Sequence, residues 1–178
     1  MQSLITQLEQ LAPSEGYNHT FIHGVGIYKS SESAVRTPLC YSQGIIFVLQ
    51  GQKRVFFDEQ IYTYNPDNYL VLTVPLPAEC ETQLTNNNPL LSLIIDFDIP
   101  VLGELVRVFD EHGKLNSSDK MSNAKGLFVS ENTDALSCTL TRLVNCLSSK
   151  LQSDIIGKGL VREVFFSCIA RPTSVAFI

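Results

Sequence analysis

Histidines are the side chains of this chain that most often hold metals or transfer protons near neutral pH. There are three, His19, His23 and His112. His19 and His23 are four residues apart and would share one face of a regular strand, but no His-x-His pair occurs and no histidine lies in residues 44–97. A metal centre needs imidazole and carboxylate ligands that converge on one point. We therefore expect surface or half-buried histidines, no bound metal and no cofactor.

Carboxylates occur in three close pairs. General acid–base catalysis needs two carboxyl groups that meet in a pocket and differ in pKa. Asp58-Glu59 and Asp110-Glu111 fall in an expected turn and at an expected helix end, where solvated charge is common. Asp96 and Asp98 close a strand and begin a helix. We expect structural roles for all three pairs, so the sequence predicts no catalytic residue.

Cations and aromatic side chains in the expected strands point to ligand binding instead. Lys53 and Arg54 are adjacent, so in a strand they point to opposite faces. Either one of them enters the interior and pairs with an anionic ligand, or both lie in solvent beyond a hairpin turn. Tyrosines can line a ligand cavity, although ordinary strand packing explains each of them as well. The residues predicted to contact a ligand are Phe47, Arg54, Tyr62, Tyr64 and Tyr69.

Composition limits the partners of this chain. Its 178 residues suit one domain around a single core, and 44% of them are apolar. The formal net charge is -5, and nucleic acid attracts basic surfaces, so we expect no direct binding of DNA or RNA. No apolar run approaches the ~20 residues that span a membrane, and the N-terminus lacks the pattern of a signal peptide.

Cysteine usage favours a reducing compartment. The five cysteines are an odd number and include no Cys-x-x-Cys motif. Cys138 and Cys146 are more than two helical turns apart, so they cannot bridge each other. We therefore expect no disulfide framework and a cytoplasmic protein. Cys138, Cys146 and Cys168 are expected as small core residues of helices.

A series of short strands positions most of these side chains. From Gly44 to Val74, apolar or aromatic runs are separated by Gln50-Gly51, by Asp58-Glu59 and by Asn65-Pro66-Asp67-Asn68, the pattern of strands joined by tight turns. The first run, residues 44–50, is apolar on both faces and is expected to be covered on both. An earlier strand is expected from Thr20, with Gly24 and Gly26 marking a bulge or the close approach of another backbone. About eight strands favour a sandwich or small barrel.

Helical patterns flank the strands. Residues 4–11 predict a short amphipathic helix that Pro13 ends. Asp98 is expected as the N-cap of a second helix, and residues 113–126 as a loop. After a short strand at 127–129, a third helix is expected to begin near Asn132 or Thr133. Ser153-Asp154 is expected to cap a fourth helix that runs antiparallel to the third.

Several motifs occur in an order that is known from one family. They are Gln50-Gly51-Gln52-Lys53-Arg54-Val55, Tyr62-Thr63-Tyr64, Tyr69-Leu70-Val71, Leu76-Pro77, the apolar run from Pro89 to Asp96, Leu143-Val144 and Leu160-Val161-Arg162-Glu163-Val164. With these motifs, most of residues 5–168 resembles the N-terminal regulatory domain of AraC-type transcription regulators. The last residues, 171–178, depart from the family's glycine-rich continuation.

The resemblance implies a fold and a function. The expected fold is α+β and mainly β, a cupin-like barrel or jelly-roll sandwich followed by helices. We expect a single domain over residues 1–178, with the first helix and barrel at 1–98 and a helical dimerisation part at 99–178. The family senses a small-molecule effector, dimerises and binds DNA through a C-terminal helix-turn-helix pair. No such pair occurs in these 178 residues, so we expect a truncated regulator that reaches DNA only through a missing domain.

The helix pair is expected to supply the homodimer interface, although both helices can instead simply cover the barrel. The residues predicted at that interface are Leu136, Leu140, Leu143, Leu147, Val161 and Phe165. Two other functions stay open at this point, a stand-alone cupin-like metal-dependent enzyme and a dimerisation module without a ligand.

Overall fold

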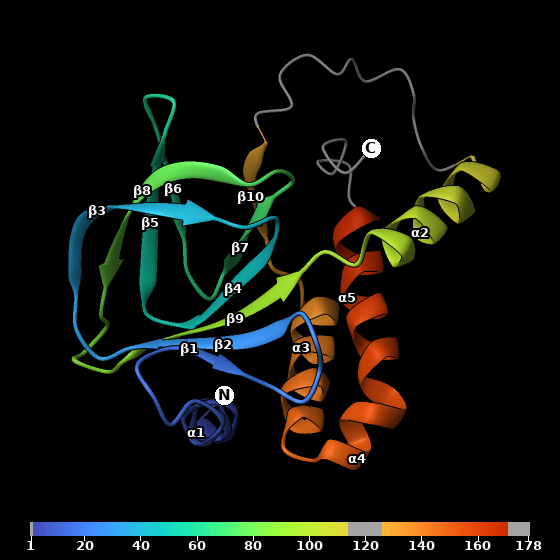
Figure 1. The fold of residues 1–178 in the computed structure, drawn as a ribbon, viewed down its shortest axis with the longest axis horizontal. Coiled ribbons are helices and arrows are strands. Elements are labelled where there is room, and N and C mark those ends of the chain that lie inside the picture. The colour runs from blue at the N-terminus through green and yellow to red at the C-terminus, as the bar shows by residue number, and fades with distance from the viewer. Residues whose placement is uncertain (1, 114–125, 171–178) are drawn as a thin grey trace.

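The computed structural model describes residues 2–113 and 126–170, which form a two-sheet sandwich with helices against one side (Figure 1). In chain order the elements are α1 (Gln2–Leu11), β1 (Gly16–His19), β2 (Val25–Ser30), β3 (Ala34–Tyr41), β4 (Gly44–Gln50), β5 (Gln52–Phe57), β6 (Gln60–Tyr64), β7 (Asn68–Leu72), β8 (Leu76–Gln83), β9 (Leu90–Asp96), α2 (Ile99–Glu111), β10 (Leu127–Glu131), α3 (Asp134–Leu147), α4 (Lys150–Gln152), the π-helical turn η1 (Ser153–Gly157) and α5 (Lys158–Ile169).

Both sheets are antiparallel. One has the strand order β1-β2-β9-β4-β7-β10 and the other β3-β8-β5-β6, and we call them the six-stranded and the four-stranded sheet. The tight turns expected between β4, β5, β6 and β7 are present, and the turn at Asp58 and Glu59 takes the positive φ angles of 50° and 61° that such hairpins need. The α+β sandwich with a helical C-terminal part confirms the predicted fold class.

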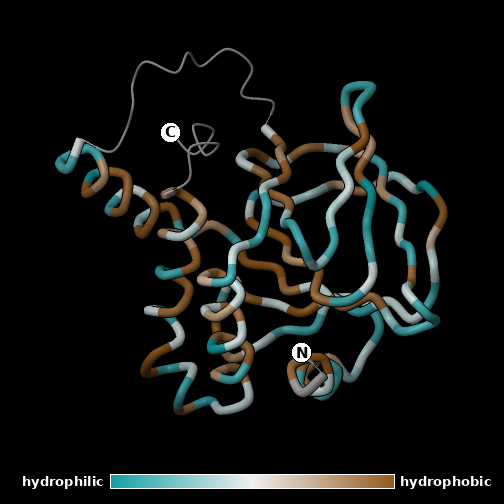
Figure 2. The backbone as a smooth tube through the Cα atoms, turned by 180° about the vertical axis from the view of Figure 1, so that it is seen from behind, coloured by the Kyte–Doolittle hydropathy of each residue, from teal (hydrophilic) through white to brown (hydrophobic). Residues whose placement is uncertain are grey.

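Two apolar cores divide the molecule into three layers. One core lies between the helices and the six-stranded sheet, and the other lies between the two sheets. Strand β4 contributes to both, since Ile45 and Phe47 face the helices while Ile46 and Val48 face the four-stranded sheet. The expectation of a strand covered on both faces is therefore confirmed. Seen from the opposite side, hydrophobic segments run through the middle of the molecule and along the helices (Figure 2).

The helical layer begins and ends at recognisable caps. The Asp98 side chain accepts a hydrogen bond from the Val101 amide at the start of α2, as predicted. Helix α3 begins at the expected place, and the Thr133 side chain caps it by accepting a hydrogen bond from the Leu136 amide. The cap that follows α3 differs from the prediction. Ser149 starts the next helical segment, while Ser153 is buried inside it and donates to the Cys146 carbonyl. The chain then passes through the π-helical turn into α5 without a new cap.

Three other expectations differ from the structure or fall outside it. Strand β2 begins at Val25 rather than near Thr20, and the short strand β1 precedes it. Gly26 is approached by the ring of Tyr17 and not by a backbone, because a Cβ there would lie 2.1 Å from Tyr17 Cζ. The short strand expected at 127–129 is present as β10, and it pairs with β7 in the six-stranded sheet. Most of the loop expected at 113–126 and the C-terminal residues 171–178 lie outside the described residues.

None of the described helices is both long and apolar enough to cross a membrane.

Gly44 and Gly103 form a matched pair for a stability test. A Cβ at Gly44 would lie 2.6 Å from the backbone carbonyl oxygen of Ile95 in the paired strand β9, whereas Gly103 on α2 has open space around it. We predict that Gly44→Ala lowers the free energy of unfolding by about 2 kcal/mol or more, because the paired backbone cannot move aside. Gly103→Ala should raise it by about 0.5–1 kcal/mol through helix propensity. Urea unfolding measures both, and equal effects at the two sites would contradict the register of β4 and β9.

Candidate functional site

A cavity of about 670 Å³ lies inside the sandwich, between the inner faces of the two sheets. The six-stranded sheet contributes Tyr28 from β2 and Ile94 from β9, and the four-stranded sheet contributes Lys53 from β5 and Cys80 from β8. Strand β3 closes one side with residues that include Tyr41. The volume falls in the range of about 300–1,000 Å³ that is typical of small-molecule sites.

Lys53 is the charged side chain inside this cavity. Only 6% of it is exposed, and its Nζ lies 4.8 Å from the centre of the Tyr28 ring. Within the described parts of the chain, Lys53 has no carboxylate partner and donates no hydrogen bond. Burial lowers the pKa of Lys53 below its usual value, and the nearby Cys80 partly offsets this. A buried cation without a counter-ion is costly, so a negatively charged group is the natural occupant of the space beside it.

Two tyrosines on the four-stranded sheet have their hydroxyls close together, and one of them, Tyr41, lines the cavity. Tyr41 and Tyr64 are buried, with their hydroxyl oxygens 3.5 Å apart. Burial raises the pKa of Tyr64 above its ordinary value, and burial together with Tyr64 and Cys80 does the same for Tyr41. Both therefore stay protonated at neutral pH. A Tyr41 hydroxyl facing the cavity can donate a hydrogen bond to a ligand oxygen.

Tyr17, His19 and Asp96 line another part of the cavity. Asp96 ends β9, and the rings of Tyr17 and His19 lie edge to face on β1 with centroids 5.0 Å apart. Burial and the Asp96 carboxylate raise the pKa of Tyr17. The small residue at Gly26 leaves the space that the Tyr17 ring fills. The cavity thus has a cationic wall at Lys53 and an acidic residue on a different wall.

The five residues predicted to bind a ligand lie elsewhere. Phe47 and Tyr69 pack against each other on the helix side of the six-stranded sheet, with ring centroids 5.1 Å apart. Arg54 points to the outer face of the four-stranded sheet, where its Nη2 donates to both carboxylate oxygens of Glu81 at 2.7 Å. Tyr62 donates to Gln60, and Tyr64 lies behind Tyr41. None of the five is among the residues that line the cavity.

The neighbour of Arg54 enters the interior instead. Lys53 shares the face of Val55, which is fully buried, because side chains alternate along a strand. In the sequence, the position of Lys53 two residues before the apolar Val55 is the signal that could have favoured Lys53 over Arg54 as the buried cation. No comparable signal singled out Tyr28, Tyr41 or Cys80, which come together only through the pairing of distant strands.

The six residues predicted at a dimer interface are mostly inside the chain's own core. Leu136, Leu140, Leu143, Leu147 and Phe165 are each at most 1% exposed, and Val161 is half-buried against the same core. These side chains hold α3 and α5 against each other and against the sandwich. The helical layer presents other apolar residues outward, among them Leu151, Ile155 and Ile156.

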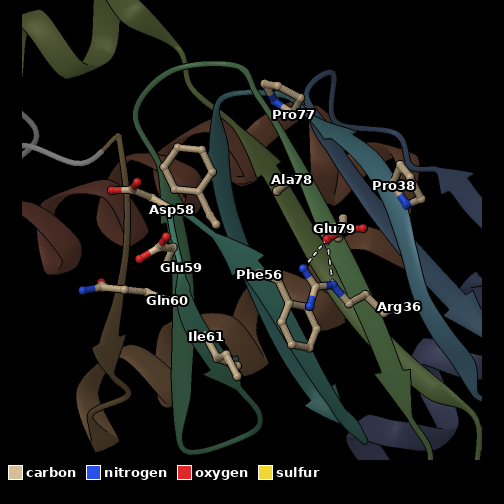
Figure 3. Close-up of a pocket in the computed structure, with 11 residues that line it drawn as sticks. Arg36, Pro38, Phe56, Asp58, Glu59, Gln60, Ile61, Pro77, Ala78 and Glu79 are labelled. Atoms are coloured by element: carbon tan, nitrogen blue, oxygen red, sulfur yellow. Dashed lines mark hydrogen bonds and ion pairs between the residues drawn. The ribbon is translucent and has the colours of Figure 1, made fainter.

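A second pocket lies on the outer face of the four-stranded sheet (Figure 3). Its volume is about 580 Å³, and it is lined by residues of β3, β5, β6 and β8 and by the β5–β6 turn. Arg36 is already satisfied there, since its Nε donates to Glu79 at 2.7 Å and its guanidinium lies 4.3 Å from the Phe56 ring centre. Because its cation, Arg36, is already paired with Glu79, this groove makes a weaker case for an anionic ligand than the cavity around Lys53.

No group of three or more histidine, cysteine or acidic side chains gathers in residues 2–113 and 126–170 in a way that could hold a metal ion. His23 and His112 lie apart from the cavity, and His112 contacts the Val108 carbonyl at the end of α2. Around Lys53, the polar groups of the cavity are instead a cation and the Tyr41 hydroxyl, which suit the binding of an anionic ligand, while Asp96 lies on another wall.

Several solved structures have a fold similar to that of this chain. An apo ToxT variant from Vibrio cholerae is 10% identical with a TM-score of 0.53, covering 86% of this chain and 55% of that one. Wild-type Vibrio cholerae ToxT with a bound unsaturated fatty acid is 11% identical with a TM-score of 0.52, and the match covers 80% of this chain and 51% of that one. Vibrio cholerae ToxT bound to (E)-4-(8-methylnaphthalen-1-yl)but-3-enoic acid is 15% identical with a TM-score of 0.50, and the match covers 86% of this chain and 61% of that one. This chain spans a little over half the length of these proteins, and the likeness shows a shared fold.

The family match is independent of that likeness. Comparison with curated proteins found no match, but the model of the AraC-type transcriptional regulator N-terminus matches residues 21–175. That range includes strands β2–β10, most of the residues that line the cavity, and the helices from α2 to α5. The match therefore covers most of the chain, which belongs to the AraC-type transcriptional regulators and corresponds to their N-terminal regulatory domain.

Proposed function

We propose that this regulatory domain senses an anionic small molecule that carries a carboxylate on an apolar body. The observation that carries the proposal is Lys53, a buried ammonium that has no counter-ion among the residues that the structure describes and that faces a cavity of about 670 Å³. A carboxylate beside it gains a charge-assisted hydrogen bond in low dielectric surroundings, and Tyr41 can donate a second one. Apolar side chains such as Ile46 and Ile94 accommodate the rest of the ligand.

The ligands of ToxT support this chemical class. The two acids bound in its structures, an unsaturated fatty acid and an aryl-substituted butenoic acid, each combine a carboxylate with a large apolar part. At this low sequence identity, the likeness to ToxT indicates a shared fold but not a shared ligand. The ligand class proposed for this chain therefore depends on Lys53 and its surroundings.

Strand β9 offers a physical route from the cavity to the helices. Its Ser92 and Ile94 face the cavity, while Leu91, Leu93 and Ile95 pack against the helical layer. The same strand leads through Asp98 directly into α2. A ligand that favours one position of β9 also favours one arrangement of the helices, and a DNA-binding domain attached to them responds by linkage. We propose regulation of this kind, rather than catalysis, for a cytoplasmic protein.

We also propose that the domain acts as a homodimer and reaches DNA only through a helix-turn-helix domain outside these residues. The exposed apolar side chains Leu151 and Ile155, at 69% and 70% exposure, are the residues that a second copy would cover. Two other functions predict different measurements. Stoichiometric metal in the purified protein would favour an enzyme, and a stable dimer without any stabilising ligand would favour a pure dimerisation module.

Lys53→Met tests the ligand site directly. We predict that it weakens binding of oleate by about tenfold to a hundredfold, because a charge-assisted hydrogen bond worth about 1.5–3 kcal/mol is lost. The measurement is a fluorescence or calorimetric titration below the concentration at which oleate forms micelles. Methyl oleate, which lacks the charge, should bind both proteins with similar affinity.

Arg54→Met is the matched control for that substitution. It removes the adjacent cation, which lies on the outer face and pairs with Glu81, and should leave oleate affinity within about twofold. A larger loss from Arg54→Met than from Lys53→Met would place the ligand outside the cavity and contradict the proposal.

Binding of the acid should also depend on pH. Burial lowers the pKa of Lys53, so the ammonium loses its proton at a lower pH than an ordinary lysine. Oleate affinity should be full below that pKa and fall as the pH rises through it, whereas Lys53→Arg should keep its affinity to about pH 10 because guanidinium stays protonated. The same titration at several pH values measures this, and a pH-independent wild-type affinity would count against the ion pair.

The dimer proposal makes a prediction about Ile155. We predict that Ile155→Glu converts a dimer into a monomer without lowering the melting temperature, because the residue is exposed in a single chain. Leu140→Ala should instead destabilise the fold by about 2–5 kcal/mol through a core cavity. Light scattering and thermal unfolding separate these effects, and a monomeric wild-type protein would refute dimerisation.

A further inference from the structure

The internal cavity contains a nucleophile that reversible binding of a carboxylate does not use. Cys80 on β8 is half-buried, lines the cavity and carries a free thiol. Cys146 and Cys168 are buried, and Cys138 is exposed on α3, contrary to the expectation of a core position. Cys40 also lines the cavity, but it is exposed on the edge strand β3, whereas Cys80 is half-buried.

Strand register brings Cys80 close to Lys53. In the pairing of β5 with β8, Lys53 lies opposite Thr82 and Val55 lies opposite Cys80. Directly opposed residues share a face, so Lys53 and Cys80 are diagonal neighbours on the inner face, with Cα atoms about 7–8 Å apart. The sulfur is near enough to the ammonium to raise the pKa of Lys53, against the larger opposite effect of burial.

This arrangement places the groups that a thiol addition needs in one cavity. The nucleophilic form of cysteine is the thiolate, and reactive cysteines have cationic neighbours and partial exposure. Lys53 is nine-tenths buried, unpaired within the described residues and directed into the same space. The hydroxyl of Tyr41 lies close to Cys80 and can donate to an oxygen that gains negative charge.

We propose that the cavity captures α,β-unsaturated carbonyl acids covalently at Cys80. The ligand carboxylate pairs with Lys53, and this holds the activated double bond next to the sulfur. The inference rests on the proposed ligand cavity and adds a second, covalent mode of sensing to it.

The addition is balanced and needs no oxidant or reductant. The Cys80 thiolate forms a bond to one alkene carbon, the carbon–carbon π bond breaks, and its electrons move onto the carbonyl as an enolate. The enolate carbon then takes up one proton, which replaces the proton that the thiol released. The product is a thioether that retains the whole ligand, so the protein gains the mass of one ligand molecule.

The test uses three related probes on the wild-type chain. Trans-3-benzoylacrylic acid carries a carboxylate and an activated double bond, its ethyl ester lacks the charge, and 3-benzoylpropionic acid lacks the double bond. Intact-mass spectrometry and peptide mapping measure the rate of labelling at each cysteine. Cys138, which is exposed on α3, is the internal reference for an ordinary thiol.

We expect the acid to label Cys80 at least about tenfold faster than Cys138, an advantage of about 1.4 kcal/mol. The ester should lose this preference, and excess oleate or 3-benzoylpropionic acid should slow labelling at Cys80 but not at Cys138. Lys53→Met should lower the preference for the acid, and Lys53→Arg should restore it. Because the probe comparison uses the wild-type protein, it remains decisive if either variant folds poorly.

Other outcomes separate this inference from the proposed function. If oleate binds as proposed but Cys80 reacts no faster than Cys138, covalent capture is wrong and reversible sensing stands. If Cys80 reacts preferentially with the acid although oleate does not bind, covalent capture stands and the fatty-acid-like ligand is wrong. Equal preference for acid and ester at Cys80 would overturn the role of Lys53 in the capture.

Discussion

The six-stranded sheet is apolar on both faces, and the rest of the structure depends on covering it. Strand β4 shows the constraint most clearly, because Ile45 and Phe47 on one side and Ile46 and Val48 on the other are all buried. A sheet of this kind cannot leave either face in water, since each exposed large apolar side chain costs about 1.5–3 kcal/mol relative to burial. The helices cover one face and the four-stranded sheet covers the other.

The two coverings are not equivalent. Against the helices, the six-stranded sheet packs closely, with Phe47, Tyr69 and Phe165 in one continuous core. Against the four-stranded sheet, the core is continuous around Val55, Leu70 and Tyr64 but gives way to a cavity around Lys53. A buried ammonium lowers stability unless something compensates its charge. A domain that retains such a group in a cavity is more stable with an anion bound, which is the thermodynamic basis of a sensor.

Much of the fold was predictable because it follows from local patterns. The period-two runs from Gly44 to Asp96, the tight turns at Gln50-Gly51 and Asp58-Glu59, the cap at Asp98 and the start of α3 next to Thr133 all occur as expected. Errors arose where distant contacts override local preference. Serine is a common N-cap residue, but Ser153 is buried within a continuous helical segment. Gly26 makes room for the ring of Tyr17 from the neighbouring strand. The ligand site was less predictable, because its residues come from five or more strands.

The sequence by itself determined the family, a mainly β fold followed by helices, and the fact that Lys53 and Arg54 point in opposite directions. These properties depend on alternation, turn chemistry and helical periodicity, which are local along the chain. Only the tertiary structure decided which of the two cations is inside, because that depends on the sheet that packs over Val55. It also decided that Cys80, Tyr41 and Tyr28 surround Lys53, and that the apolar stripe of α3 faces the chain's own core. Such neighbours are set by strand register and layer packing, which no single segment of the sequence contains.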